Sequence, residues 1–114
     1  DDFYIWSGND DQVVPMMALG AKGVISVASN IVPEVMAEMT HLCLDNDFAA
    51  ASQLQIRYMD LIDALFTEVN PIPIKAAMNL LGMDAGSLRL PLCDISDKNL
   101  DTLRRAMERA GLLK

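Results

Sequence analysis

The sequence predicts an α/β fold in which two short parallel strands alternate with helices and a longer helical segment follows. Runs rich in β-branched and aromatic residues lie at 3–6 and 23–28, and each precedes a segment with helical periodicity. Beyond residue 46 most apolar residues recur at helical spacing. Two parallel strands do not form a stable sheet in water, and each would expose an unpaired edge. The sequence therefore indicates an incomplete α/β protein.

The first strand–helix unit begins with the run Phe3-Tyr4-Ile5-Trp6, in which Trp6 is expected to be buried. The turn that follows contains Asp10 and Asp11, whose carboxylates are expected to cap a helix. That helix is predicted over 12–19, with Gly20 at its C-terminal end.

The second unit begins with the strand predicted at 23–28. It shows no in–out alternation, which is typical of a strand buried on both faces of a parallel sheet. A helix from Pro33 to Leu44 follows, because an apolar stripe runs along one face of that segment. We therefore expect residues 1–45 to form two successive strand–helix units.

Residues 46–114 are predicted to be helical. Asp47 is expected to cap a long helix that reaches about Glu68, where the prolines of the segment 70–73 end it. A helix over 73–81 and an irregular segment over 83–95 follow. Ser96 is expected to cap the last helix, which ends at Gly111.

The composition limits the classes of function and partner. The 114 residues are 52% hydrophobic with a mean hydropathy of +0.22, a high apolar share that indicates a partner or a homo-oligomer. A net charge of −7 and the absence of a basic run argue against nucleic acid. No apolar run is long enough to cross a membrane, and residues 1–11 do not resemble a signal peptide. Cys43 and Cys93 lack CxxC spacing, which favours free thiols and a cytoplasmic location.

Four motifs occur in one order along the chain: Ser7-Gly8-Asn9-Asp10, the strand at 23–27 with Asn30, Asn-Pro-Ile-Pro-Ile-Lys at 70–75, and Leu-Arg-Leu-Pro-Leu at 88–92. Together they resemble the C-terminal part of the dihydrodipicolinate synthases (4-hydroxy-tetrahydrodipicolinate synthases), over essentially the whole chain. The resemblance implies a TIM (β/α)₈ barrel with residues 3–6 as its seventh strand and 23–28 as its eighth. Residues from about 47 onward would form the family's C-terminal helical extension. A complete barrel takes about 250 residues, so the first six strand–helix units would lie outside this chain.

The resemblance also implies a chemistry. Enzymes of this family are lyases that condense pyruvate with aspartate semialdehyde through a Schiff base on a lysine, without a further cofactor. The chain has four lysines, Lys22, Lys75, Lys98 and Lys114. None of them follows a predicted strand, where the catalytic groups of barrels lie. We therefore expect no catalytic residue here and no activity from the chain alone.

The chain can contribute a wall of the pyruvate pocket. Ser7, Gly8 and Asn9 follow the first predicted strand, and Gly8 either lets backbone approach the ligand or serves only the turn. The residues alone would place Ile25 in the core, whereas the resemblance matches it to a position whose backbone contacts pyruvate. Asn9 stands where many relatives carry aspartate, which puts any role for a carboxylate there in doubt.

The sequence also fits other functions. The related N-acetylneuraminate lyases and 2-keto-3-deoxy sugar acid aldolases share the barrel and the Schiff base. A non-enzymatic helical module that pairs through its apolar stripes is the alternative of a different class. A metal site is not expected, because the sole histidine, His41, has no second ligand at i+4.

Overall fold

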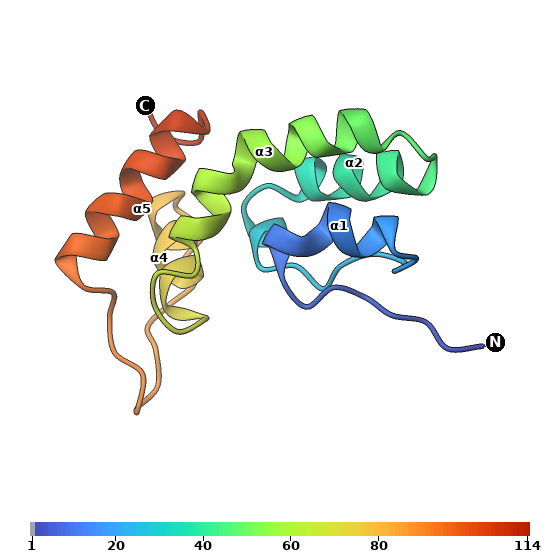
Figure 1. The fold of residues 1–114 in the computed structure, drawn as a ribbon. Coiled ribbons are helices and arrows are strands. Elements are labelled where there is room, and N and C mark those ends of the chain that lie inside the picture. Colours follow the sequence, from blue (N-terminus) through green and yellow to red (C-terminus); the bar gives the residue numbers. More distant parts are fainter. Residues whose placement is uncertain (1) are drawn as a thin grey trace. The chain divides into compact units, whose positions relative to one another are not determined.

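A computed structural model describes residues 2–114. The chain divides into two compact units, one ending at Met59 and the other comprising Asp60–Lys114. The described residues contain five α-helices and two short 3₁₀ helices (Figure 1). In chain order they are η1 (Asp10–Gln12), α1 (Val13–Ala18), η2 (Ala28–Asn30), α2 (Pro33–Leu44), α3 (Phe48–Ala64), α4 (Ile72–Leu80) and α5 (Asp97–Arg109).

The first unit is built around the contact between α1 and α2. Val13 of α1 and Met39 of α2 are fully buried, as are Ala28 of η2 and Ala51 in the first turn of α3. The helix predicted from Pro33 to Leu44 is confirmed at both ends. Gly20 follows α1 with a φ of +106°, a conformation that glycine adopts more easily than residues with a side chain. The helix predicted over 12–19 is also confirmed, as α1 at Val13–Ala18.

The two predicted strands are not formed within residues 2–114. A single parallel bridge joins Ser7 to Val24, through the bonds from Ser7 N to Gly23 O (2.8 Å) and from Ile25 N to Ser7 O (2.9 Å). On the N-terminal side of this bridge, Ile5 O accepts from Lys22 N. In a regular parallel ladder, the N–H of Gly23 would donate to Ile5 O. The observed donor is Lys22 N, so the pairing slips by one residue, as in a β-bulge. This slip ends the ladder after one bridge.

The prediction that these two segments are buried is also wrong for residues 2–114. Trp6 is 50% exposed and Ile25 is 76% exposed, although both were expected in a core. A strand is buried on both faces only when neighbouring strands and covering helices surround it. Within residues 2–114 each of these segments has only the other as a paired neighbour.

The second unit packs α4 against α5. Leu65, Ala77, Leu103 and Met107 are fully buried in it. The helices predicted over 73–81 and from Ser96 onward are confirmed, as is the irregular segment between them. The long helix α3 ends at Ala64, before the predicted Glu68, where the Thr67 hydroxyl donates to Ala64 O (3.0 Å).

One predicted cap is confirmed and another is replaced. The Asp47 carboxylate accepts from Ala50 N (3.0 Å) at the start of α3. The Ser96 side chain makes no capping bond within α5. Instead, Oε1 of Glu68 accepts from Ser96 N (3.0 Å), Ser96 Oγ (2.7 Å) and Asn99 Nδ2 (2.8 Å). A carboxylate at this position is favourable, because the N-terminus of a helix carries a partial positive charge.

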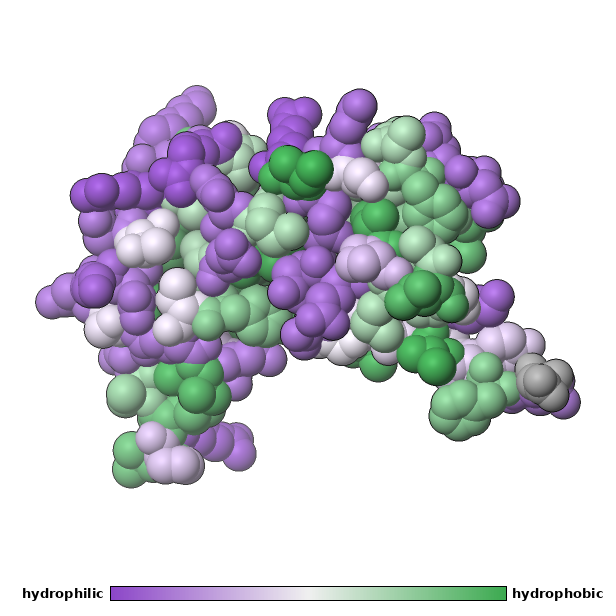
Figure 2. Space-filling model, viewed as in Figure 1, coloured by the Kyte–Doolittle hydropathy of each residue, from purple (hydrophilic) through white to green (hydrophobic). Residues whose placement is uncertain are grey.

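Large hydrophobic side chains also lie at the surface. Leu19 and Leu90 are each 91% exposed, and Figure 2 shows apolar surface over the loop between α4 and α5. No helix within residues 2–114 is long and apolar enough to cross a membrane.

Replacing Glu68 with alanine should lower the free energy of unfolding, because three donors at the start of α5 lose their acceptor. The hydrogen bonds from the side chain of Ser96, the side chain of Asn99 and the backbone of Ser96 hold the pKa of Glu68 below its usual range. The stabilisation should therefore be present at neutral pH and be lost as the pH falls through the lowered pKa. Urea unfolding at several pH values measures both effects.

The matched control is Glu108→Ala, at an exposed position on α5. An equal loss of stability in the two variants at neutral pH would contradict the capping role of Glu68.

The two cysteines should differ in reactivity. Both are free thiols, but burial raises the pKa of the Cys43 thiol, and the thiolate is the reactive form. Iodoacetamide at pH 8 should therefore modify exposed Cys93 first, as followed by peptide mass spectrometry. Equal rates in the folded protein would contradict the burial of Cys43, and equal rates in urea provide the control.

Candidate functional site

Ser7 is the residue around which the candidate site is built. It is fully buried, and its hydroxyl donates to Asn9 O (2.7 Å) and accepts from Asn9 N (3.2 Å). Its backbone forms the bridge to Val24. The side chain thus shapes its own turn while the main chain joins that turn to the segment 23–25.

The structure brings the four predicted site residues together in the first unit. Gly8 and Asn9 are exposed in the turn that Ser7 holds. Ile25 lies beside this turn, because its backbone N–H donates to Ser7 O. A Cβ added at Gly8 would meet no atom within 4 Å. The described residues alone therefore do not require a glycine there, and a close-approaching ligand remains a reason for one.

Asp10 is the residue whose role sequence reasoning missed. It was expected to cap the following helix, but neither η1 nor α1 receives a side-chain capping bond. The carboxylate is fully buried, and its Oδ2 accepts from Val27 N (2.9 Å) and Ala28 N (3.0 Å). The expectation fails because these donors lie 17 and 18 residues further along the chain, a separation that no local pattern reports.

Gln55 of α3 fixes the backbone around Asp10. It is buried, and its Nε2 donates to Asp10 O (2.8 Å) while its Oε1 accepts from Val14 N (3.1 Å). The amide thus satisfies an acceptor at the start of η1 and a donor in the first turn of α1. In the sequence, Gln55 lies at helical spacing from Ala51 and Tyr58, on a face of the long helix where apolar residues are expected. A glutamine on that face is the one sign of a buried polar contact that the sequence carries.

The side-chain hydrogen bonds described above involve none of the four lysines. Lys22 is exposed beside Gly23, and Lys98 and Lys114 are exposed as well. In the second unit, the Lys75 Nζ donates to Ser87 O (2.7 Å).

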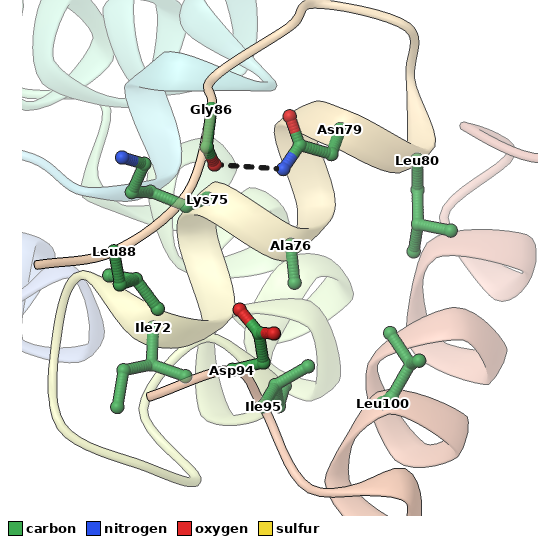
Figure 3. Close-up of a pocket in the computed structure, with 10 residues that line it drawn as sticks. All are labelled: Ile72, Lys75, Ala76, Asn79, Leu80, Gly86, Leu88, Asp94, Ile95 and Leu100. Carbon is green, nitrogen blue, oxygen red and sulfur yellow. Dashed lines mark hydrogen bonds between the residues drawn. The ribbon is translucent and has the colours of Figure 1, made fainter. Parts of the chain in front are cut away.

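The second unit contains a cavity of about 310 Å³ next to Lys75 (Figure 3). Its lining is mostly aliphatic and comes from α4, the loop over 83–95 and α5. The Asn79 amide donates to Gly86 O (3.3 Å) and accepts from Ala85 N (2.7 Å). Because Asn79 and Lys75 both bind the backbone of the loop, the polar groups at this cavity hold the loop on α4.

The described residues contain no group of three or more His, Cys, Asp or Glu side chains arranged to hold a metal ion. His41 is exposed on α2.

Comparison with known proteins identifies the family. The model of the dihydrodipicolinate synthetase family matches residues 1–110. The chain belongs to this family. A 4-hydroxy-tetrahydrodipicolinate synthase of a Thermoanaerobacter species is 53% identical over 112 residues, and one of Acetivibrio thermocellus is 49% identical over 112 residues. Each alignment covers 98% of this chain, but the chain spans only 38% of either relative.

Solved structures of dihydrodipicolinate synthases share the fold. The Thermotoga maritima synthase is 41% identical with a TM-score of 0.94, over 98% of this chain and 38% of the other. The Aquifex aeolicus synthase is 43% identical with a TM-score of 0.95, again over 98% and 38%. The conformation of this chain is thus that of the corresponding part of the synthases.

Replacing Ser7 with alanine should loosen the turn that carries Gly8 and Asn9. The buried hydroxyl makes two local hydrogen bonds, and losing them should lower the free energy of unfolding by about 1 kcal/mol. Hydrogen exchange at the Asn9 amide should accelerate. Ser87→Ala, at an exposed serine in the loop over 83–95, is the control, and an Asn9 amide that exchanges equally in both variants would refute the role of Ser7.

Proposed function

We propose that this chain forms the C-terminal portion of a 4-hydroxy-tetrahydrodipicolinate synthase, a lyase that condenses pyruvate with aspartate semialdehyde through a lysine Schiff base. The family match over residues 1–110 carries the proposal. The Schiff-base lysine would come from chain outside these 114 residues. The enzyme would act in the cytoplasm, on the route to diaminopimelate and lysine, with no further cofactor.

Within that enzyme we assign residues 1–45 to the last two strand–helix units of the barrel and 46–114 to the helical extension. The Ser7–Val24 bridge supports this assignment, because adjacent barrel strands are parallel. Ser7, Gly8, Asn9 and the backbone of Ile25 would then line the pyruvate pocket. A structure of the Acinetobacter baumannii synthase was solved with pyruvate, and that protein is 35% identical to this chain with a TM-score of 0.93.

The exposed hydrophobic residues support the proposed partner. Phe3, Tyr4, Ile5 and Trp6 are each at least half exposed, and Ile25 is 76% exposed. Such surface is usually covered in a folded assembly. We propose that the preceding part of the barrel covers it, and that the chain otherwise self-associates through the same residues.

The alternatives from sequence are less well supported. The relatives named above are synthases rather than N-acetylneuraminate lyases or sugar acid aldolases. A purely helical interaction module has no use for a parallel bridge between its first turn and the segment 23–25.

Grafting this chain into the Thermoanaerobacter synthase, in place of its matching C-terminal part, tests the proposal. The graft should keep kcat/KM within about tenfold of the parent enzyme, a change of roughly 1.4 kcal/mol in transition-state stabilisation. The chain alone, incubated with pyruvate and borohydride, should show no mass increase. An inactive but folded graft would refute the function, and an adduct on the chain alone would refute an external nucleophile.

A Gly8→Val variant of the graft tests the pocket wall separately. An added Cβ meets no atom within 4 Å in this chain, and the KM for pyruvate should rise while the unfolding midpoint stays near that of the unaltered graft. Ala49→Val, at an exposed position on α3, is the control. Equal KM values in the two variants would remove Gly8 from the pocket.

A further inference from the structure

Asp10 carries a buried carboxylate for which the proposed chemistry has no use. The residue has no exposed surface. Its Oδ2 accepts two backbone hydrogen bonds, whereas its Oδ1 has no hydrogen-bond partner among residues 2–114. A buried carboxylate is costly unless its hydrogen bonds repay the loss of water, so its two bonds to the segment 27–28 matter to the structure.

The segments 7–10 and 23–28 are joined at two places, which we call fastenings. The bonds of the Asp10 carboxylate form the second of them. The first is the bridge between Ser7 and Val24. The second joins the Asp10 carboxylate to Val27 and Ala28, three to four residues further along each segment. Between the fastenings lie Gly8 and Asn9 on one side and Ile25 on the other, which are the residues of the proposed pocket wall.

The backbone of Asp10 is itself held in place by a side chain of α3. Its backbone oxygen accepts from Nε2 of Gln55 on α3. The carboxylate therefore reaches the segment 27–28 from a fixed main chain. Val27 is the N-cap residue of η2 and Ala28 is its first residue. Their N–H groups have no acceptor within that short helix and donate to the carboxylate instead.

We infer that Asp10 is a positioning residue for pyruvate binding: its carboxylate sets the separation between the turn 7–9 and the Ile25 backbone. This inference rests on the proposed function. Asp10 does not touch the substrate in it, and acts only through the two segments that it fastens. Without the carboxylate the wall would be held at the Ser7 end alone.

The fastening is tested first in the chain itself, independently of any activity. Hydrogen exchange resolved at single amides should accelerate at least tenfold at Val27 and Ala28 in Asp10→Ala. Asp10→Asn keeps an oxygen that can accept both bonds, and its amide nitrogen would replace the Oδ1 that has no partner within residues 2–114. Exchange in this variant should stay near that of the unaltered chain. Unchanged exchange in Asp10→Ala would overturn the inference.

The positioning role is tested in the graft with the Thermoanaerobacter synthase. Asp10→Ala should raise the KM for pyruvate about tenfold or more, with a smaller change in kcat, and Asp10→Asn should restore most of the loss. Met39→Ala, which truncates a fully buried side chain of α2 and removes none of the hydrogen bonds of Asp10, is the control for lost stability. It should lower the unfolding midpoint with a smaller effect on KM.

The outcomes separate the two proposals. A graft that is inactive before any substitution refutes the proposed function, while the exchange data still decide whether Asp10 fastens the segments. An active graft whose KM for pyruvate is the same in Asp10→Ala as in the unaltered sequence overturns the positioning role. So does a KM that rises equally in Asp10→Ala and Met39→Ala, because a general loss of stability would then explain both.

Discussion

In the first unit, one buried carboxylate connects the turn after Ser7 to the segment 27–28. Asp10 joins two segments that the rest of the backbone pairs only once, at Ser7 and Val24. A regular sheet would have distributed this task over a ladder of backbone bonds. Here a one-residue slip ends the ladder, and side-chain to backbone bonds supply the remaining connections. Gln55 extends the same arrangement into α3 through polar contacts with Asp10 and Val14 inside an otherwise apolar core.

The helices could be predicted from sequence because their signals are local. Proline in the first turn of α2 and α4, glycine after α1 and α4, and the cap at Asp47 all act within a few residues. The predicted strands were wrong for residues 2–114 because strand formation needs partners distant in sequence. The exposed Trp6 and Ile25 reflect the same dependence. A composition of 52% hydrophobic residues had already indicated that part of the apolar surface lacks a partner within the chain.

The candidate site also has one part that could be predicted from the sequence and one part that could not. The turn at Ser7, Gly8 and Asn9 is a local feature, and its motif could be recognised directly in the sequence. The role of Asp10 could not, because a carboxylate before a helix is most simply a cap and its true donors are far along the chain. Glu68 is a parallel case. The sequence placed it inside a helix, whereas in the structure it follows α3 and accepts bonds from residues 28 and 31 positions away.

The contact between Glu68 and the start of α5 affects how segments can be exchanged between relatives. In the sequence, Glu68 precedes α4 and the irregular loop, whereas its donors Ser96 and Asn99 follow them. A recombination point placed anywhere between them would combine the carboxylate of one parent with the serine and asparagine positions of another. Crossovers before residue 68 or after residue 99 keep the three together. The junctions that preserve this helix start are therefore set by a hydrogen-bond network rather than by the visible boundaries of the helices.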